Sequence, residues 1–123
     1  MTTPAPWLTE PDRLEWTHEG YPCLAVRNSF GAWCGYVGVP ESHPWYERCE
    51  ADLADVQTHG RVSYADHCRG AVCHEAIVPV WWVGFCCAYE FDGWPGHEGP
   101  YRDVEYVRQQ CANLVLQAKE AAR

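Results

Sequence analysis

The last twenty residues show a strong helical periodicity, which sets what the rest of the fold must provide. Apolar residues recur there at spacings of three and four, at Val104, Val107, Cys111, Leu114, Val115 and Ala118. Residues at these spacings share one helix face, so the pattern predicts an amphipathic helix over about residues 103–121. Because a helix of this kind draws most of its stability from packing, the chain must also supply an apolar surface for it to cover.

Two apolar runs, at residues 21–27 and 32–39, flank a turn and predict a β-hairpin. With a two-residue turn between the strands, Cys34 lies opposite Ala25 and on the same face as Cys23. A slip of one residue would place the two cysteines on opposite faces of the hairpin. The register therefore decides whether these thiols are neighbours.

The rest of the chain predicts shorter elements. In chain order these are an extended, proline-rich lead-in at 1–13, a strand at 14–17, a short helix near 43–53, a strand at 61–64, and one or two central strands within 76–88, interrupted near Pro79. Together the patterns predict a single α+β domain over residues 1–123. In it an antiparallel sheet is packed on one face by the long C-terminal helix.

The balance of charged residues restricts the kind of partner that the protein is expected to bind. The chain has 9 Lys+Arg and 17 Asp+Glu, which gives a formal net charge of −8. This charge repels phosphate backbones, and the basic residues do not cluster, so direct nucleic-acid binding is not expected. The sequence has neither an apolar run of the roughly 20 residues that a membrane helix needs nor a basic, then apolar, leader. We therefore expect a cytoplasmic protein without membrane contact.

Eight cysteines raise the question of disulfides, metal or packing. Without a leader toward an oxidising compartment, disulfides are not expected, and packing is the default role of most of these cysteines. Zinc is a weaker alternative. Its ligands would come from the cluster around Cys68, Cys73 and His74, with Cys87 downstream. The gap of four residues and the lack of a matching second pair do not fit common zinc motifs, so we expect no cofactor.

A reactive cysteine is a second alternative. Cys87 would be the nucleophile, His59 its base and Asp92 the residue that orients the base. None of the three lies in a recognised nucleophile motif. The plainer interpretation is that Cys87 ends a buried strand and that His59 caps a turn.

Aromatic and polar residues together favour a ligand pocket near the start of the C-terminal helix. Rings supply flat apolar walls, and Arg102 at the helix start could clamp an anion with the help of helix amides. Trp81 and Trp82 are adjacent in a strand and point to opposite faces, so only one can line a pocket. The candidate ligand-binding residues are Arg102, Tyr101, Trp82, Trp94, Tyr64, His59, Asp92 and His43.

Several short motifs occur in a characteristic order. They are Gly35-Tyr36-Val37-Gly38-Val39-Pro40, His43-Pro44, His59-Gly60, Trp82 to Asp92, and Tyr101-Arg102-Asp103. In this order the motifs resemble a family of small uncharacterised proteins encoded in bacteriophage genomes. The family usually carries Asp and His where this chain has Cys86 and Tyr89. The resemblance implies that metal or hydrolytic chemistry is weakened here and that binding is retained.

The resemblance also implies a phage context, in which small proteins often counteract host defence. Our leading hypothesis is a non-catalytic protein in the cytoplasm of the infected bacterial host that sequesters a small anionic or nucleotide-like signalling molecule. One alternative is an acidic inhibitor that binds a host defence protein, acting as a nucleic-acid mimic. A Cys/His enzyme or a zinc-stabilised protein is the other. The sequence leaves homo-oligomerisation open.

Overall fold

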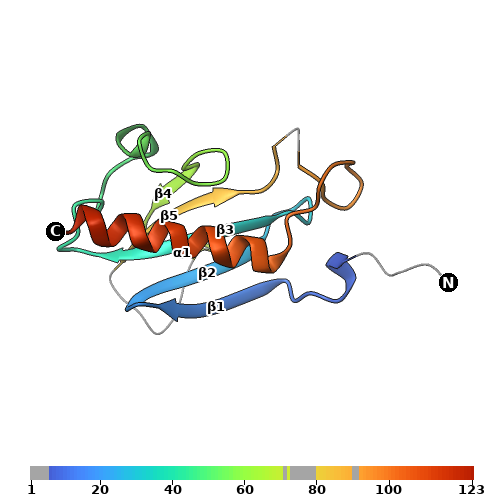
Figure 1. The fold of residues 1–123 in the computed structure, drawn as a ribbon, viewed down its shortest axis with the longest axis horizontal. Coiled ribbons are helices and arrows are strands. Elements are labelled where there is room, and N and C mark those ends of the chain that lie inside the picture. Colours follow the sequence, from blue (N-terminus) through green and yellow to red (C-terminus); the bar gives the residue numbers. More distant parts are fainter. Residues whose placement is uncertain (1–5, 71, 73–79, 90–91) are drawn as a thin grey trace.

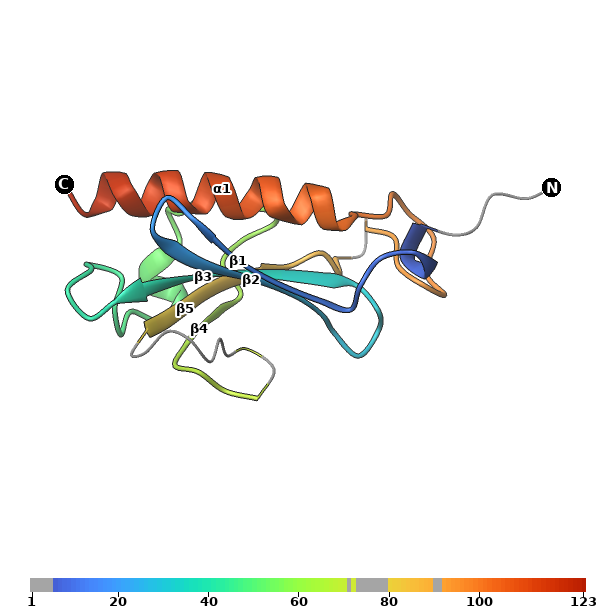
Figure 2. The same cartoon turned by 90° about the horizontal axis from the view of Figure 1, so that it is seen from below.

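The computed structural model describes residues 6–70, 72, 80–89 and 92–123. Its strands are β1 (Arg13–His18), β2 (Tyr21–Arg27), β3 (Trp33–Pro40), β4 (Tyr64–Asp66) and β5 (Val80–Cys86). They form one antiparallel sheet in the order β1-β2-β3-β5-β4. The helix α1 (Val104–Ala121) lies across one face of this sheet, as Figure 2 shows from the side. The predicted α+β fold class is confirmed.

The helix α1 agrees with its predicted bounds. Asp103 caps it, because its side chain accepts a hydrogen bond of 2.8 Å from the Tyr106 amide. The apolar stripe is buried against the sheet. Gly35 in β3 makes this close approach possible, since a Cβ there would lie 2.9 Å from Val107 and 2.6 Å from the Phe85 ring. No helix in the described part of the chain is long and apolar enough to cross a membrane.

The two faces of the sheet carry separate clusters of buried side chains. The face under α1 includes Trp81, Val83 and Phe85 of β5, whereas the opposite face includes Trp82 of the same strand. This alternation confirms that Trp81 and Trp82 point to opposite sides. Only groups on the helix-covered face and at the loops around its edge can contact α1.

The hairpin of β2 and β3 has the predicted strands but not the predicted register. The Asn28 amide donates to the Ala32 carbonyl at 2.8 Å, which leaves three residues in the turn instead of two. Gly31 is the third of them, with a φ of +88° that favours glycine. Cys34 therefore pairs with Val26, and Cys23 lies on the opposite face.

Two of the shorter predicted elements are shifted. Helical structure near 43–53 is limited to a 3-10 helix over Glu50–Leu53, because Glu47 has a φ of 61°, which a continuous right-handed helix cannot contain. The strand predicted at 61–64 is β4, which starts at Tyr64. In the lead-in, a 3-10 helix covers Pro6–Leu8. The part of the apolar stretch at 76–79 lies outside the described residues.

The expectation of reduced cysteines is wrong. Cys34 of β3 and Cys86 of β5 are Cα partners on adjacent strands and form a disulfide. Cys68 is disulfide-bonded as well. Cys34 and Cys86 are 52 positions apart, and local sequence patterns did not indicate their contact because only the strand order makes them neighbours. The free cysteines of the described chain are Cys23, Cys49, Cys87 and Cys111.

Candidate functional site

Asp92 is the centre of a buried polar cluster at the start of α1. Its side chain is 0% exposed. One carboxylate oxygen accepts a hydrogen bond of 3.1 Å from Arg102 Nε. The other lies 2.7 Å from His59 Nε2 and accepts a hydrogen bond of 3.1 Å from the Tyr89 amide. Because buried carboxylates are costly without partners, these contacts hold three loop segments together.

His59 links this cluster to the helix. Its Nδ1 lies 2.6 Å from the hydroxyl of Tyr106, which belongs to the first turn of α1. The Arg102 guanidinium lies over the Tyr106 ring, 5.0 Å from its centre. His59 and Asp92, which the sequence hypothesis pairs as base and orienting residue, are thus in contact. Their catalytic roles stay a prediction, and the second imidazole nitrogen faces Tyr106.

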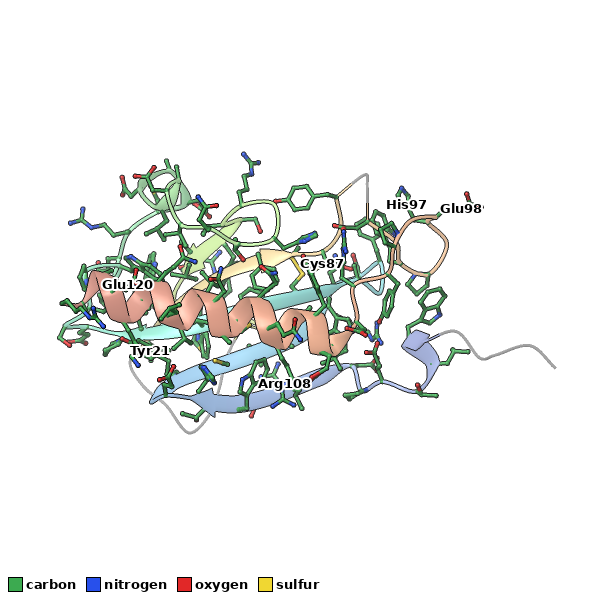
Figure 3. The ribbon with its side chains drawn as sticks, viewed as in Figure 1. Tyr21, Cys87, His97, Glu98, Arg108 and Glu120 are labelled. Atoms are coloured by element: carbon green, nitrogen blue, oxygen red, sulfur yellow. A yellow bond between two sulfur atoms is a disulfide. The ribbon has the colours of Figure 1, made fainter. Side chains whose placement is uncertain are left out.

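Cys87 does not have the surroundings of a nucleophile. It is 1% exposed and belongs to the core cluster that includes the apolar stripe of α1; Figure 3 shows it near the end of β5. Burial, together with the negative charge of Asp92, raises the pKa of its thiol to about 12. Since the thiolate is the reactive form, this thiol stays protonated and inert near neutral pH.

A second cluster, which sequence reasoning missed, surrounds Glu10. Tyr101 donates to Glu10 Oε1 at 2.5 Å, Trp33 Nε1 donates to the same oxygen at 3.2 Å, and the Val104 amide donates to Oε2 at 2.8 Å. Arg27 lies 3.3 Å from this carboxylate. Glu10 thereby ties the lead-in to the N-terminus of α1. No periodic pattern marks a single Glu in a proline-rich segment.

The burial of Tyr101 has a measurable consequence. Desolvation, together with the Glu10 carboxylate that accepts its hydrogen bond, raises the pKa of its hydroxyl to about 12. Tyr101 is therefore neutral and acts as a hydrogen-bond donor. It is not free to bind a ligand through its hydroxyl.

Trp94 lies in the loop that precedes α1. Its ring stacks on His97 with the centres 3.9 Å apart and the planes 6° apart. The hollow beside the stack has a volume of about 520 Å³. It is lined by Trp7, Trp94, Gly96, His97, Glu98 and Gly99. Arg102 is not among these lining residues.

Two further hollows flank Arg61, which precedes β4. One has a volume of about 360 Å³ and is lined by Arg61, Ser63, Cys86, Ala88 and Tyr89. The other, of about 480 Å³, lies on the side of the 3-10 helix and shares Arg61 and Ser63 with the first. The Tyr89 ring is seated directly on Gly60, where a Cβ would come within 2.2 Å of it. Sequence reasoning missed Arg61, whose only signal is one basic residue after a turn.

The remaining predicted ligand residues lie elsewhere. Trp82 is fully buried on the sheet face away from α1, and Tyr64 packs edge-on against Tyr36 on that same face. His43 accepts a hydrogen bond from the Trp45 amide and donates to the Ala118 carbonyl. Burial lowers the pKa of His43, which keeps it neutral. Ala118 is roughly 20 Å along α1 from its first turn.

The zinc alternative has no described site. Cys73 and His74 lie outside the described residues, and Cys68 is disulfide-bonded. Within the described ranges, no group of three or more His, Cys, Asp or Glu side chains is arranged to hold a metal ion. A thiol that takes part in a disulfide cannot also ligate a metal as a thiolate.

Comparisons of this chain with protein-family models, with curated proteins and with solved structures found no match.

Proposed function

We propose that this chain is a non-catalytic binding protein that holds a small nucleotide-like anion in the hollow between Arg61 and Tyr89. The Arg61 side chain makes no ion pair or hydrogen bond with any described residue, which supports the proposal. Among the described arginines this is true only of Arg61 and of Arg123 near the chain end. An unpaired guanidinium beside a hollow is suited to bind a carboxylate or phosphate.

The surroundings of Arg61 add to this support. Ser63 lines the same hollow, and a serine hydroxyl can donate to an anion. The Tyr89 ring is held by Gly60 beneath it and offers a flat apolar face to a base. None of the described lining residues of the 360 Å³ hollow is acidic. Glu50 lines only the neighbouring hollow, and we therefore place the anion on the Tyr89 side.

Arg102 is less suited to this task than Arg61. Its Nε already donates to Asp92, and its side chain is 29% exposed. A phosphate at Arg102 would compete with the buried Asp92 carboxylate, which depends on the positive charge of this guanidinium. We therefore place the anion-binding role at Arg61 and a positioning role at Arg102.

The biological setting of the proposal is host defence. It rests on the resemblance of the sequence motifs to phage-encoded proteins, where sequestering a nucleotide signal would block an immune response. A protein of this kind needs tight binding and no turnover. The inert Cys87 thiol is consistent with binding alone.

Calorimetric titration with mononucleotides, dinucleotides and cyclic dinucleotides tests the proposal. We expect at least one of them to bind, and Arg61→Gln to weaken binding by about tenfold or more, because a hydrogen bond to a charged group contributes about 1.5–3 kcal/mol. Arg123→Gln is the matched control, since it removes the same charge elsewhere. Absence of binding across the panel, or equal affinities for the two variants, would refute the proposal.

A second candidate function is inhibition of a host protein through an acidic surface. The segment between β3 and β4 carries five exposed carboxylates, at Glu41, Glu47, Glu50, Asp52 and Asp55. Such a row could imitate nucleic acid toward a basic groove. Replacing the five by Gln and Asn would abolish inhibition under this candidate function, whereas nucleotide binding at Arg61 would persist.

A further inference from the structure

The hollow beside Trp94 has a different chemistry from the one beside Arg61, and the two share no lining residue. It lies at the end of the molecule where α1 begins, and Figure 3 shows His97 and Glu98 there. The N-terminal end of the described chain reaches the same end (Figure 1). This hollow is therefore a separate site.

The walls of this hollow are aromatic and held in place. The loop is closed on itself by hydrogen bonds between the backbones of Trp94 and His97, at 2.9 and 3.2 Å. These bonds fix the stack of the two rings, and both rings line the hollow. Trp7 packs edge-on against Tyr101, and its carbonyl accepts a hydrogen bond from Arg27. Rings held in this way attract a cation placed over their faces.

The charge at this end favours a cation as well. The segments 6–12, 27–31 and 92–103 contain five carboxylates and two guanidiniums. Both guanidiniums, Arg27 and Arg102, are paired with carboxylates. Glu98 lines the hollow, is exposed, and has no hydrogen-bond or ion-pair partner among the described residues. An anion would be repelled here, whereas a cation would find a free carboxylate.

The rim of the hollow suits a polypeptide better than a small ion. Leu8 and Phe30 are 70% and 64% exposed, the two most exposed large hydrophobic side chains of the described chain. Leu8 follows Trp7 in the chain, and the Phe30 ring lies 6.3 Å from the Trp94 ring. Exposed apolar residues around a charged hollow are typical of protein interaction sites.

We infer that this end of the molecule docks a basic segment of a partner protein. One arginine side chain of the partner enters the hollow, lies against the Trp94–His97 stack and pairs with Glu98. Apolar residues of the same segment cover Leu8 and Phe30. The inference does not depend on the anion site at Arg61.

The test uses peptides and the indole N–H signals of the full chain in two-dimensional NMR. The probe is an acetylated nonapeptide with a central arginine flanked by leucines, and its counterpart has citrulline, the neutral isostere, in place of arginine. We expect the arginine peptide to shift the signals of Trp94 and Trp7, assigned with Trp94→Phe and Trp7→Phe. We expect the citrulline peptide to bind about fivefold more weakly or worse.

Glu98→Gln should weaken the arginine peptide by about fivefold, whereas the matched control Glu120→Gln at the other end of α1 should not. Equal binding of the two peptides, or of the two variants, would overturn the inference. Concentration-dependent dimerisation lost in Phe30→Ser would overturn it too, since it would assign the surface to a second copy of this chain. Arg61→Gln leaves peptide binding unchanged, so a failure here is distinct from a failure of the nucleotide proposal.

Discussion

Asp92 is the residue on which the polar contacts from His59, Tyr89 and Arg102 converge near the start of α1. It is fully buried and accepts from a guanidinium and a backbone amide, with an imidazole nitrogen beside it. Removing one member of a buried charged cluster leaves the others without compensation. Asp92 therefore stabilises the fold mainly because its loss would leave the polar groups around it without a partner.

We predict that Asp92→Asn lowers the free energy of unfolding by about 3 kcal/mol. This is the lower end of the cost of breaking a buried ion pair, because Arg102 is partly exposed and can be hydrated. Urea unfolding followed by tryptophan fluorescence measures it. Asp55→Asn, at an exposed position, should stay within about 0.5 kcal/mol of the parent chain. If the two variants have the same free energy of unfolding, the cluster around Asp92 does not stabilise the fold.

At the scale of elements, the segment before β1 is held to α1 through Glu10. Burial by itself would raise the pKa of Glu10, but hydrogen bonds from Tyr101, Val104 and Trp33, and the charge of Arg27, bring it below the ordinary value of 4.5. A folded-state pKa below the unfolded value means that the ionised carboxylate stabilises the fold. This stability is present above the unfolded pKa and is lost as the pH falls through the folded pKa.

We predict that Glu10→Gln lowers the free energy of unfolding at pH 7 by about 1.5–3 kcal/mol, the range for hydrogen bonds to a charged group. The loss should shrink as the pH falls below 4.5, because the parent chain then protonates Glu10 as well. Unfolding curves at pH 7, 5 and 3 check this. Glu120→Gln is the control. If the free energy of unfolding differs between variant and parent by the same amount at all three pH values, the stabilisation does not come from the ionised Glu10 carboxylate.

At the scale of the whole molecule, the Cys34–Cys86 disulfide joins two adjacent strands of the sheet, at the start of β3 and the end of β5. The bond links β3, the central strand of the sheet, to its neighbour β5, whereas α1 packs mainly on β3 and β2. It closes a loop of 52 residues in sequence separation, which includes β4 and the 3-10 helix Glu50–Leu53. The unfolded chain is restricted accordingly.

We predict that the double variant Cys34→Ala/Cys86→Ala loses about 4 kcal/mol of unfolding free energy under oxidising conditions, the loop entropy for this separation. Cys49→Ala, an exposed free cysteine, should lose none. Thermal and urea unfolding report both. If a reducing agent destabilises the double variant as much as the parent chain, the stabilisation does not come from this bond.

The local elements follow from the sequence to a large extent. The bounds of β2 agree with the apolar run at 21–27, and the cap at Asp103 and the stripe through Val107 define α1. Where prediction failed, one residue decided the outcome. Gly31 lengthened the hairpin turn by one residue, and Glu47 interrupted the helix predicted near 43–53, which leaves only the 3-10 helix Glu50–Leu53. Single backbone conformations of this kind leave little trace in a periodicity that averages over many positions.

The candidate sites could be predicted from the sequence much less well than the local elements. His59 and Asp92 are in contact, but Tyr64 and Trp82 face the far side of the sheet, and His43 lies near the end of α1. The sequence patterns did not mark Glu10 or Arg61 as site residues, and they did not indicate the contact between Tyr106 and His59. Which residue a side chain contacts depends on which strand lies next to its own strand and on which loop packs over it.

The sequence alone accounts for one long helix over an antiparallel sheet, since spacing along the chain controls which face a residue takes. Only the tertiary structure decided which distant residues meet. Asp92 and His59 are 33 positions apart, Glu10 and Tyr101 are 91 apart, and the disulfide spans 52. Such meetings depend on strand order and register, which short-range patterns do not encode. The pairing of arginines, which leaves Arg61 without an ion-pair or hydrogen-bond partner among the described residues, is decided at the same level.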